Sequence, residues 1–330
     1  MADASLPGPG AIIAGEADGD DGDDAVVEER VATVAAAQHG ERLDKAIVAF
    51  VPEFSRSHLQ QLIRSGHVAA DGTPATSPAQ RVRAGQRIAV RLHPTAESRA
   101  YVAEALPLAV VHEDRDLLVL DKAAGMVVHP AAGNWTGTLL NALLARDPAS
   151  AALPRAGIVH RLDKDTSGLM VVGRTLVAVT ALVRAIAARE VQRRYLAIAH
   201  GTAPGERWSV DAPIGRDPRT RTKMAVLASG KPARTDVERV AASDGFVALR
   251  CTLHSGRTHQ IRVHLAAQGL PLVGDRLYGG APALGMQRQA LHAALLAFRH
   301  PRSGARLAFE SAPPGDFAHA WDEVVAAGSP

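Results

Sequence analysis

The chain has 330 residues, a formal net charge of +3 and a single cysteine, Cys251. This length suggests two domains, or one large domain with appendages, and one cysteine excludes an intrachain disulfide framework. No stretch approaches the roughly 18 consecutive apolar residues of a membrane-spanning helix, and the N-terminus lacks a basic region followed by an apolar run. We therefore expect a cytoplasmic protein in which Cys251 is a buried structural thiol.

The charge is distributed unevenly along the chain. Residues 1–30 contain nine acidic residues and one basic residue, a net charge of −8, so the rest of the chain carries +11. A basic body suggests a polyanionic partner, although charge alone does not separate nucleic acid from a membrane surface. Residues 1–38 are rich in Gly, Ala, Pro and Asp without apolar periodicity, and are predicted to be an acidic disordered tail.

The segment 39–93 has the pattern of a small α/β module. Its apolar spacing predicts a first helix that ends before Pro52 and a second that runs from Ser55 to Gly66. Short strands are expected at 67–70 and 87–92.

Residues 41–44 and 55–57, together with the hairpin pattern, resemble the RNA-binding module named after small-subunit ribosomal protein four. The resemblance implies that Arg56 and Arg64, on the polar face of the second helix, contact RNA. The alternative is a small, surface-charged unit without a ligand.

Residues 94–107 are predicted to form a linker, and residues 108–325 a larger domain. Strands dominate its pattern, without regular alternation of strands and helices, so we expect an α+β fold with a mixed, mainly antiparallel sheet. Its apolar runs predict strands at 108–111, 117–120, 193–199, 235–240 and 246–253, and helices at 137–144, 175–189 and 259–268.

One polar loop in this domain gathers residue types that carry chemistry. Between the apolar runs of residues 157–172 lie two carboxylates, two cations, a histidine and two hydroxyl groups, and loops on rigid scaffolds often carry function. The alternative is a turn in which Asp165, Thr166 and Ser167 bind nearby backbone amides.

Several segments of the larger domain follow one another in a recognisable order: 121–130, His160-Arg161-Leu162-Asp163 with Thr166-Ser167-Gly168, 194–197, 256–264 and 274–279. This order resembles that of the RluA-type pseudouridine synthases, and with the N-terminal module the resemblance covers roughly residues 40–320. Within the family, residues 128–141 are most similar to the RluD-type members, which act on large-subunit ribosomal RNA; Ala123 departs from the Lys-Pro that is common there.

This resemblance implies an RNA isomerase that converts uridine to pseudouridine without cofactor or metal. Asp163 is the expected catalytic carboxylate, acting covalently or by moving a proton. Arg262 is expected to pair with Asp163, and Tyr195 to stack on the target base. Arg161 is expected to fill the space that the flipped uridine leaves. Helix-surface and core positions are the alternatives for Arg262 and Tyr195.

A cationic loop follows the tyrosine strand and is predicted to grip RNA phosphates, with a solvated charge run as the alternative. Its cations are Arg216, Arg219, Arg221 and Lys223. The expected partner is large-subunit ribosomal RNA or a pre-ribosomal particle, bound by a monomer.

Other functions remain as alternatives. Asp163 and Asp165 as an acid–base pair would suit hydrolysis, but a spacing of two is weak evidence and Asp165 is predicted to be structural. A metal-dependent nuclease would need ligands such as His254, His259 and His264, whose spacing matches no compact zinc pattern. A non-catalytic ribosome-assembly factor on the same fold, or a synthase acting on transfer RNA, are the remaining alternatives.

Overall fold

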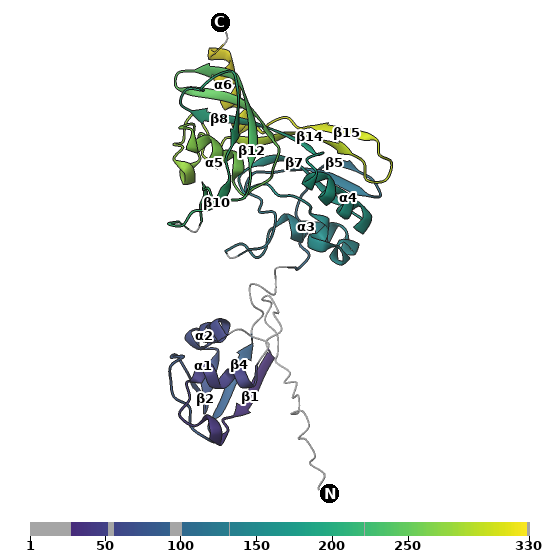
Figure 1. The fold of residues 1–330 in the computed structure, drawn as a ribbon. Coiled ribbons are helices and arrows are strands. Elements are labelled where there is room, and N and C mark those ends of the chain that lie inside the picture. Colours follow the sequence, from purple (N-terminus) through teal and green to yellow (C-terminus); the bar gives the residue numbers. More distant parts are fainter. Residues whose placement is uncertain (1–27, 52–55, 93–100, 132, 221, 329–330) are drawn as a thin grey trace. The chain divides into compact units, whose positions relative to one another are not determined.

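The computed structural model describes residues 28–51, 56–92, 101–131, 133–220 and 222–328. The chain divides into two compact units, residues 1–95 and 96–330 (Figure 1). No described helix has the length and apolar character needed to cross a membrane.

The N-terminal unit is a small sheet with short helices and its own apolar core. Leu43 and Ile47 from the first helical segment and Leu59 and Ile63 from the second pack against Ile88 of the sheet. The sheet has the order β1-β4-β2-β3. The elements are β1 (Glu28–Thr33), η1 (Ala36–Gln38), α1 (Leu43–Ala46), η2 (Ile47–Ala49), α2 (Arg56–Arg64), β2 (Val68–Ala70), β3 (Thr73–Pro74) and β4 (Arg87–Leu92).

Strand β1 corrects the prediction that residues 1–38 are a disordered tail. Its six residues pair antiparallel with β4, with Arg30 opposite Val90. The strand lies at the edge of the sheet and is held by backbone pairing. Its Val31 is 44% exposed. Because such a strand needs few buried side chains, its sequence lacks the apolar alternation by which strands are predicted. The N-terminal unit therefore begins before residue 39, while the predicted tail residues 1–27 lie outside the described residues.

The C-terminal unit is built on a nine-stranded sheet of order β5-β6-β7-β14-β8-β13-β12-β9, with β15 paired to β14. All its strand pairs are antiparallel except β7 with β14, which confirms the predicted mixed, mainly antiparallel α+β fold. The strands are β5 (Ala109–Glu113), β6 (Leu117–Lys122), β7 (Ser167–Gly173), β8 (Gln192–His200), β9 (Arg207–Asp211), β12 (Arg234–Ser243), β13 (Phe246–Leu253), β14 (Leu291–Arg299) and β15 (Arg306–Glu310).

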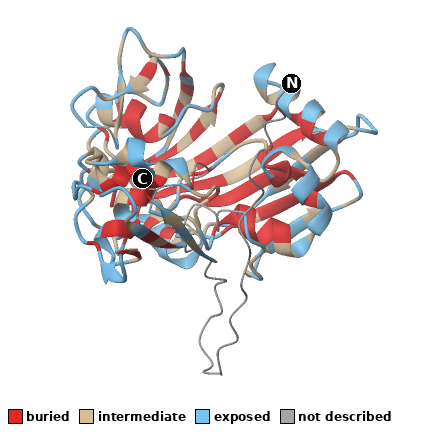
Figure 2. Ribbon diagram, turned by 90° about the horizontal axis from the view of Figure 1, so that it is seen from below, coloured by how far each residue is buried: buried red, intermediate tan, exposed pale blue. Residues whose placement is uncertain are grey.

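Helices cover both faces of this sheet (Figure 1). Helices α3 (Leu139–Arg146) and α5 (Gln260–Ala267) share one apolar cluster. Helices α4 (Leu176–Ala187) and α6 (Gly315–Ala327) belong to clusters on the other face. The strands between them are largely buried (Figure 2). The remaining elements are η3 (Pro148–Ala152), η4 (Pro154–Gly157), the hairpin of β10 (Ile214–Arg216) and β11 (Met224–Val226), and η5 (Arg276–Tyr278).

The second half of the predicted linker contacts the C-terminal unit. The Asn141 side chain donates to the carbonyl of Val102 at 2.8 Å, and the amide of Gly137 donates to the Glu104 carboxylate at 3.0 Å. Residues 101–107 are therefore anchored at the start of α3, and residues 94–100 of that linker lie outside the described residues.

Candidate active site

A cavity of about 810 Å³ opens in the C-terminal unit. Asp163 is the only carboxylate among its described lining residues, so the wall has a large excess of positive charge, which suits a polyanionic ligand. The wall also contains Tyr195 and four histidines, His129, His160, His254 and His259. Its arginines are Arg155, Arg161, Arg189, Arg193, Arg257 and Arg262.

Two glycines allow the loop that carries Asp163 to fold closely against the sheet. Gly157 has φ +84°, and a Cβ there would lie 1.9 Å from the carbonyl oxygen of Gly173. Gly168 has φ +114°, and a Cβ there would lie 2.3 Å from the carbonyl oxygen of Ala293. Both positions need a residue that tolerates positive φ and has no side chain.

Surrounding segments hold the backbone of this loop in place. The buried ammonium of Lys122 donates to the carbonyl of Lys164 at 3.0 Å, and burial lowers the pKa of Lys122 to about 8. Arg288 donates to the carbonyl of Asp165 at 2.9 Å. Thr166 is buried and its amide donates to the carbonyl of Asp163 at 3.1 Å. The tertiary structure therefore fixes the position of Asp163.

Arg262 connects the loop to a second, deeply buried carboxylate. Its Nη1 donates to Asp163 Oδ2 at 3.0 Å, while Nε and Nη2 bind both oxygens of Asp275 at 2.7 and 2.8 Å. Burial opposes the charge on Arg262, but the hydrogen bond to Asp275 and the charges of both carboxylates raise its pKa above the ordinary value. Asp275 thus aims the arginine at Asp163.

The second oxygen of Asp163 faces a histidine. His259 Nε2 lies 3.9 Å from Asp163 Oδ1, and its Nδ1 contacts the Tyr278 hydroxyl at 2.8 Å. That hydroxyl also accepts the amide proton of Met224, at the start of β11, at 2.9 Å. Burial lowers the pKa of His259, so Oδ1 has a neutral neighbour that is too distant for a hydrogen bond.

Tyr195 and His160 complete the cavity wall near the loop. Tyr195 lies on β8, is 6% exposed, and burial raises the pKa of its hydroxyl. His160 Nε2 accepts the amide proton of Val171 at 3.0 Å. Burial, and then the charge of Arg193, lower the pKa of His160 to about 3. His160 therefore braces the loop as a neutral acceptor.

The residues predicted to bind RNA occupy different environments. Arg161 is exposed and lines the cavity. Arg64 is exposed on α2, whereas Arg56 is paired with the buried carboxylate of Asp44 at 3.0 Å. The structure thus gives Arg56 a structural partner that the sequence did not indicate.

The predicted cationic loop is the tip of the β10–β11 hairpin. Arg216 and Arg219 are exposed and Lys223 is half-buried, while Arg221 lies outside the described residues. None of the described cations lines the cavity, but Met224 links the base of the hairpin to Tyr278 and so to His259.

The histidines considered as metal ligands do not converge. His254 binds Asp236 at 2.6 Å, and His264 contacts Thr235 and the carbonyl of Ala212. Asp165, the other carboxylate of the loop, does not line the cavity. Its backbone carbonyl accepts a hydrogen bond from Arg288, which agrees with its predicted structural role.

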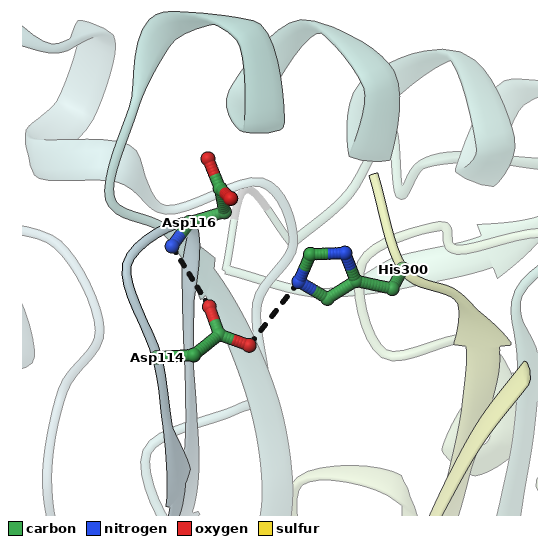
Figure 3. A group of neighbouring side chains, drawn as sticks. All are labelled: Asp114, Asp116 and His300. Carbon is green, nitrogen blue, oxygen red and sulfur yellow. Dashed lines mark hydrogen bonds and ion pairs between the residues drawn. The ribbon is translucent and has the colours of Figure 1, made fainter. Parts of the chain in front are cut away.

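Within the described residues, one cluster has the composition of a metal site, Asp114, Asp116 and His300 (Figure 3). Asp114 accepts the amide proton of Asp116 at 2.8 Å and contacts His300 at 3.1 Å. The Arg302 guanidinium binds both oxygens of Asp116 at 2.5 and 2.6 Å. Because an arginine already supplies the positive charge, the cluster is an ion-pair network that joins the turn between β5 and β6 to the turn between β14 and β15.

Sequence reasoning missed four residues of the site. Asp275 and Lys122 both lie in segments that resemble the family, 274–279 and 121–130, but the sequence assigned neither residue a role. His259 was considered only as a metal ligand. Arg193 had no signal beyond its place on the strand that carries Tyr195.

The sequence matches known families. The model for RNA pseudouridylate synthase matches residues 116–267, and the model for the S4 domain matches residues 41–88. The chain is 48% identical over 301 residues to the ribosomal large subunit pseudouridine synthase D of Xanthomonas campestris, covering 87% of this chain and 90% of that protein. It is 44% identical to the protein of that name from Yersinia pestis, over 86% and 91% of the two chains.

Solved structures show the same fold. The human RNA pseudouridylate synthase domain containing 1 is 27% identical, with a TM-score of 0.52 over 69% of this chain and 90% of that chain. The S4 match agrees with the RNA-binding module that residues 41–44 and 55–57 suggested. The match to the human protein agrees with the predicted α+β fold.

Proposed function

Because the chain belongs to the RNA pseudouridine synthase family, whose members are isomerases, we propose that it converts uridine to pseudouridine in large-subunit ribosomal RNA. The reaction breaks the bond between ribose C1′ and N1, rotates the base and forms a bond from C1′ to C5; C5 loses a proton and N1 takes one up. No atom or electron is gained, so the reaction needs no external reactant. A ribosomal substrate implies a cytoplasmic enzyme.

The observation that carries the proposal is the pairing of Asp163 with Arg262 at the wall of a cationic cavity. Attack on ribose and removal of a proton both require an ionised carboxylate, and Arg262 provides the neighbouring positive charge. Arg262 binds one oxygen of Asp163, which leaves Oδ1 available to the substrate. We propose that Asp163 is the reacting group and Arg262 its positioning partner.

The remaining site residues have roles that follow from RNA chemistry. A uridine must leave its stack to reach a half-buried carboxylate in the cavity wall, at a cost of a few kcal/mol. We propose that the Tyr195 ring stacks on the flipped base and that Arg161 fills the vacated position. Cations of the β10–β11 hairpin and Arg64 of the N-terminal unit would offset the cost through phosphate contacts. We propose that the protein acts as a monomer.

The first experiment measures tritium release from large-subunit ribosomal RNA labelled at uridine C5, with the unsubstituted enzyme and with Asp163→Asn. We expect release by the unsubstituted enzyme only. Asn retains the size of the side chain and removes its charge, so the comparison isolates the carboxylate.

Other outcomes separate the alternatives. No release despite tight binding of unmodified RNA would favour the assembly-factor function, and release only from transfer RNA would change the substrate. Equal release by both proteins would retain the reaction and remove Asp163 from its centre.

A further inference from the structure

A buried guanidinium group with no ion-pair partner among the described residues lies in the wall of the cavity. Arg193, on β8, is 5% exposed, and among the described residues its Nε meets no hydrogen-bond acceptor. No ion pair joins Arg193 to a described carboxylate. A buried charge is costly unless it is paired and hydrogen-bonded. The fold therefore keeps a buried positive charge that forms no direct ion pair with any described carboxylate.

The surroundings leave room for this guanidinium. Gly256 faces it so closely that a Cβ there would lie 2.8 Å from Arg193 Nη1. Both residues line the cavity. Any larger residue at position 256 would displace the tip of Arg193 from its place in the wall.

His160 lines the same cavity but does not neutralise Arg193. Its Nε2 accepts the Val171 amide proton, so the proton of the neutral ring is on Nδ1, which is buried and has no hydrogen-bond partner in the described chain. Burial, and then the charge of Arg193, lower the pKa of His160. The histidine therefore contributes neither a positive nor a negative charge to this part of the wall.

The strand geometry relates Arg193 to the base site. Arg193 and Tyr195 are two residues apart on β8 and both are buried, so they lie on the same face, about 7 Å apart along the strand. A nucleotide has a similar span between its base and its own phosphate groups.

We propose that the Arg193 guanidinium forms a subsite for a phosphate group adjacent to the flipped uridine. The proposal rests on the proposed function in one respect, the position of the base at Tyr195. A guanidinium binds phosphate oxygens through strong charge-assisted hydrogen bonds. The ligand supplies the counter-charge that Arg193 lacks, and the subsite fixes the register of the RNA in the cavity.

The test measures binding of a short RNA hairpin that contains the target uridine, at several salt concentrations. Asp163→Asn is the parent, so that the RNA is not converted during the measurement. Adding Arg193→Gln is expected to weaken binding at least about tenfold, the value of a charged hydrogen bond. It should also reduce the slope of log K against log salt by about 0.7 to 0.9, because one phosphate contact is lost.

Chemical substitution of the RNA identifies the group that is bound. Replacing the phosphate on the 5′ or the 3′ side of the target uridine by a neutral methylphosphonate should weaken binding to the parent at one of the two positions. The same replacement should have no further effect on Arg193→Gln, since the lost interaction is the same. A methylphosphonate several nucleotides away is the control and should affect both proteins equally.

A second variant distinguishes loss of the phosphate contact from loss of folding. Gly256→Ala keeps the charge of Arg193 and displaces it, so it should weaken binding with a melting temperature near that of the parent. Weaker binding of Arg193→Gln with an unchanged salt slope would assign the contact to a uracil carbonyl and overturn the phosphate subsite.

Unchanged binding of both variants would also overturn the subsite. Tritium release by the unsubstituted enzyme on the same hairpin is scored separately. Its absence would count against the proposed function, whereas normal release with unchanged phosphate dependence would count against the subsite alone.

Discussion

Asp275 sets the orientation of Arg262 through two hydrogen bonds to the same guanidinium. Asp275→Asn retains the shape and removes the charge, so Arg262 should lose its fixed direction towards Asp163. We expect kcat to fall roughly 10- to 100-fold, corresponding to the 1.5–3 kcal/mol of a charged hydrogen bond, with little change in KM.

The control for this change is Asp165→Asn, which should retain near-normal kcat, because Asp165 contributes its backbone carbonyl. Initial rates of tritium release over a range of RNA concentrations, up to saturation, give kcat and KM for both variants. A similar loss of kcat in the two variants would mean that any negative charge near the loop supports the reaction, and would contradict a specific role for Asp275.

His160 makes stability depend on pH. Its pKa falls from 6.5 in the unfolded chain to about 3 in the folded protein, so between these values the unfolded state binds more protons and stability falls as pH falls. Because the residue as a whole is half-buried, the loss between pH 7.5 and pH 5 is at most about 2 kcal/mol. Urea unfolding at both pH values should show this loss, and His160→Gln should show less of it. An equal pH dependence in the variant would assign the effect to other groups.

At the scale of elements, the close contact of β7 with β14 depends on Gly168. Gly168→Ala would place a Cβ against the backbone of Ala293 and would force a strained φ, with an expected loss of about 3 kcal/mol. Gly205→Ala is the matched control, because no atom lies within 4 Å of its added Cβ. Urea unfolding of the two variants measures the difference, and equal stability would show that the strands can separate without cost.

Elements whose sequence is periodic were predicted well. Helix α4 was expected at 175–189 and found at Leu176–Ala187, with the Thr175 hydroxyl accepting from the amide of Ala178 at 3.2 Å. Strand β1 and the C-terminal elements β14, β15 and α6 were not identified. Strand β14 is buried along most of its length and so has no alternation, and α6 follows Pro314 and begins with Gly315, residues that are typical of turns.

At the scale of the whole molecule, the described cavity wall belongs entirely to the C-terminal unit. The N-terminal unit has its own core and matches the S4 domain. Removing residues 1–95 should therefore weaken RNA binding, with KM at least about tenfold higher, and leave kcat at saturating RNA nearly unchanged. Steady-state tritium release on ribosomal RNA fragments measures both constants. A large loss of kcat with an intact fold would mean that the N-terminal unit takes part in the chemical step.

Local sequence determined the class of the fold, most helices and strands, and the loop that carries Asp163, because apolar period and the order of motifs are properties of neighbouring residues. Burial of Cys251 also followed from its apolar surroundings. Only the tertiary structure decided which distant groups meet that loop. Lys122 reaches it from another segment, and Asp275 acts on it through Arg262. That Arg193 Nε has no described hydrogen-bond partner is likewise a property of its surroundings. The absence of a counter-charge cannot be read from residues adjacent in sequence, since it depends on every element packed around the cavity.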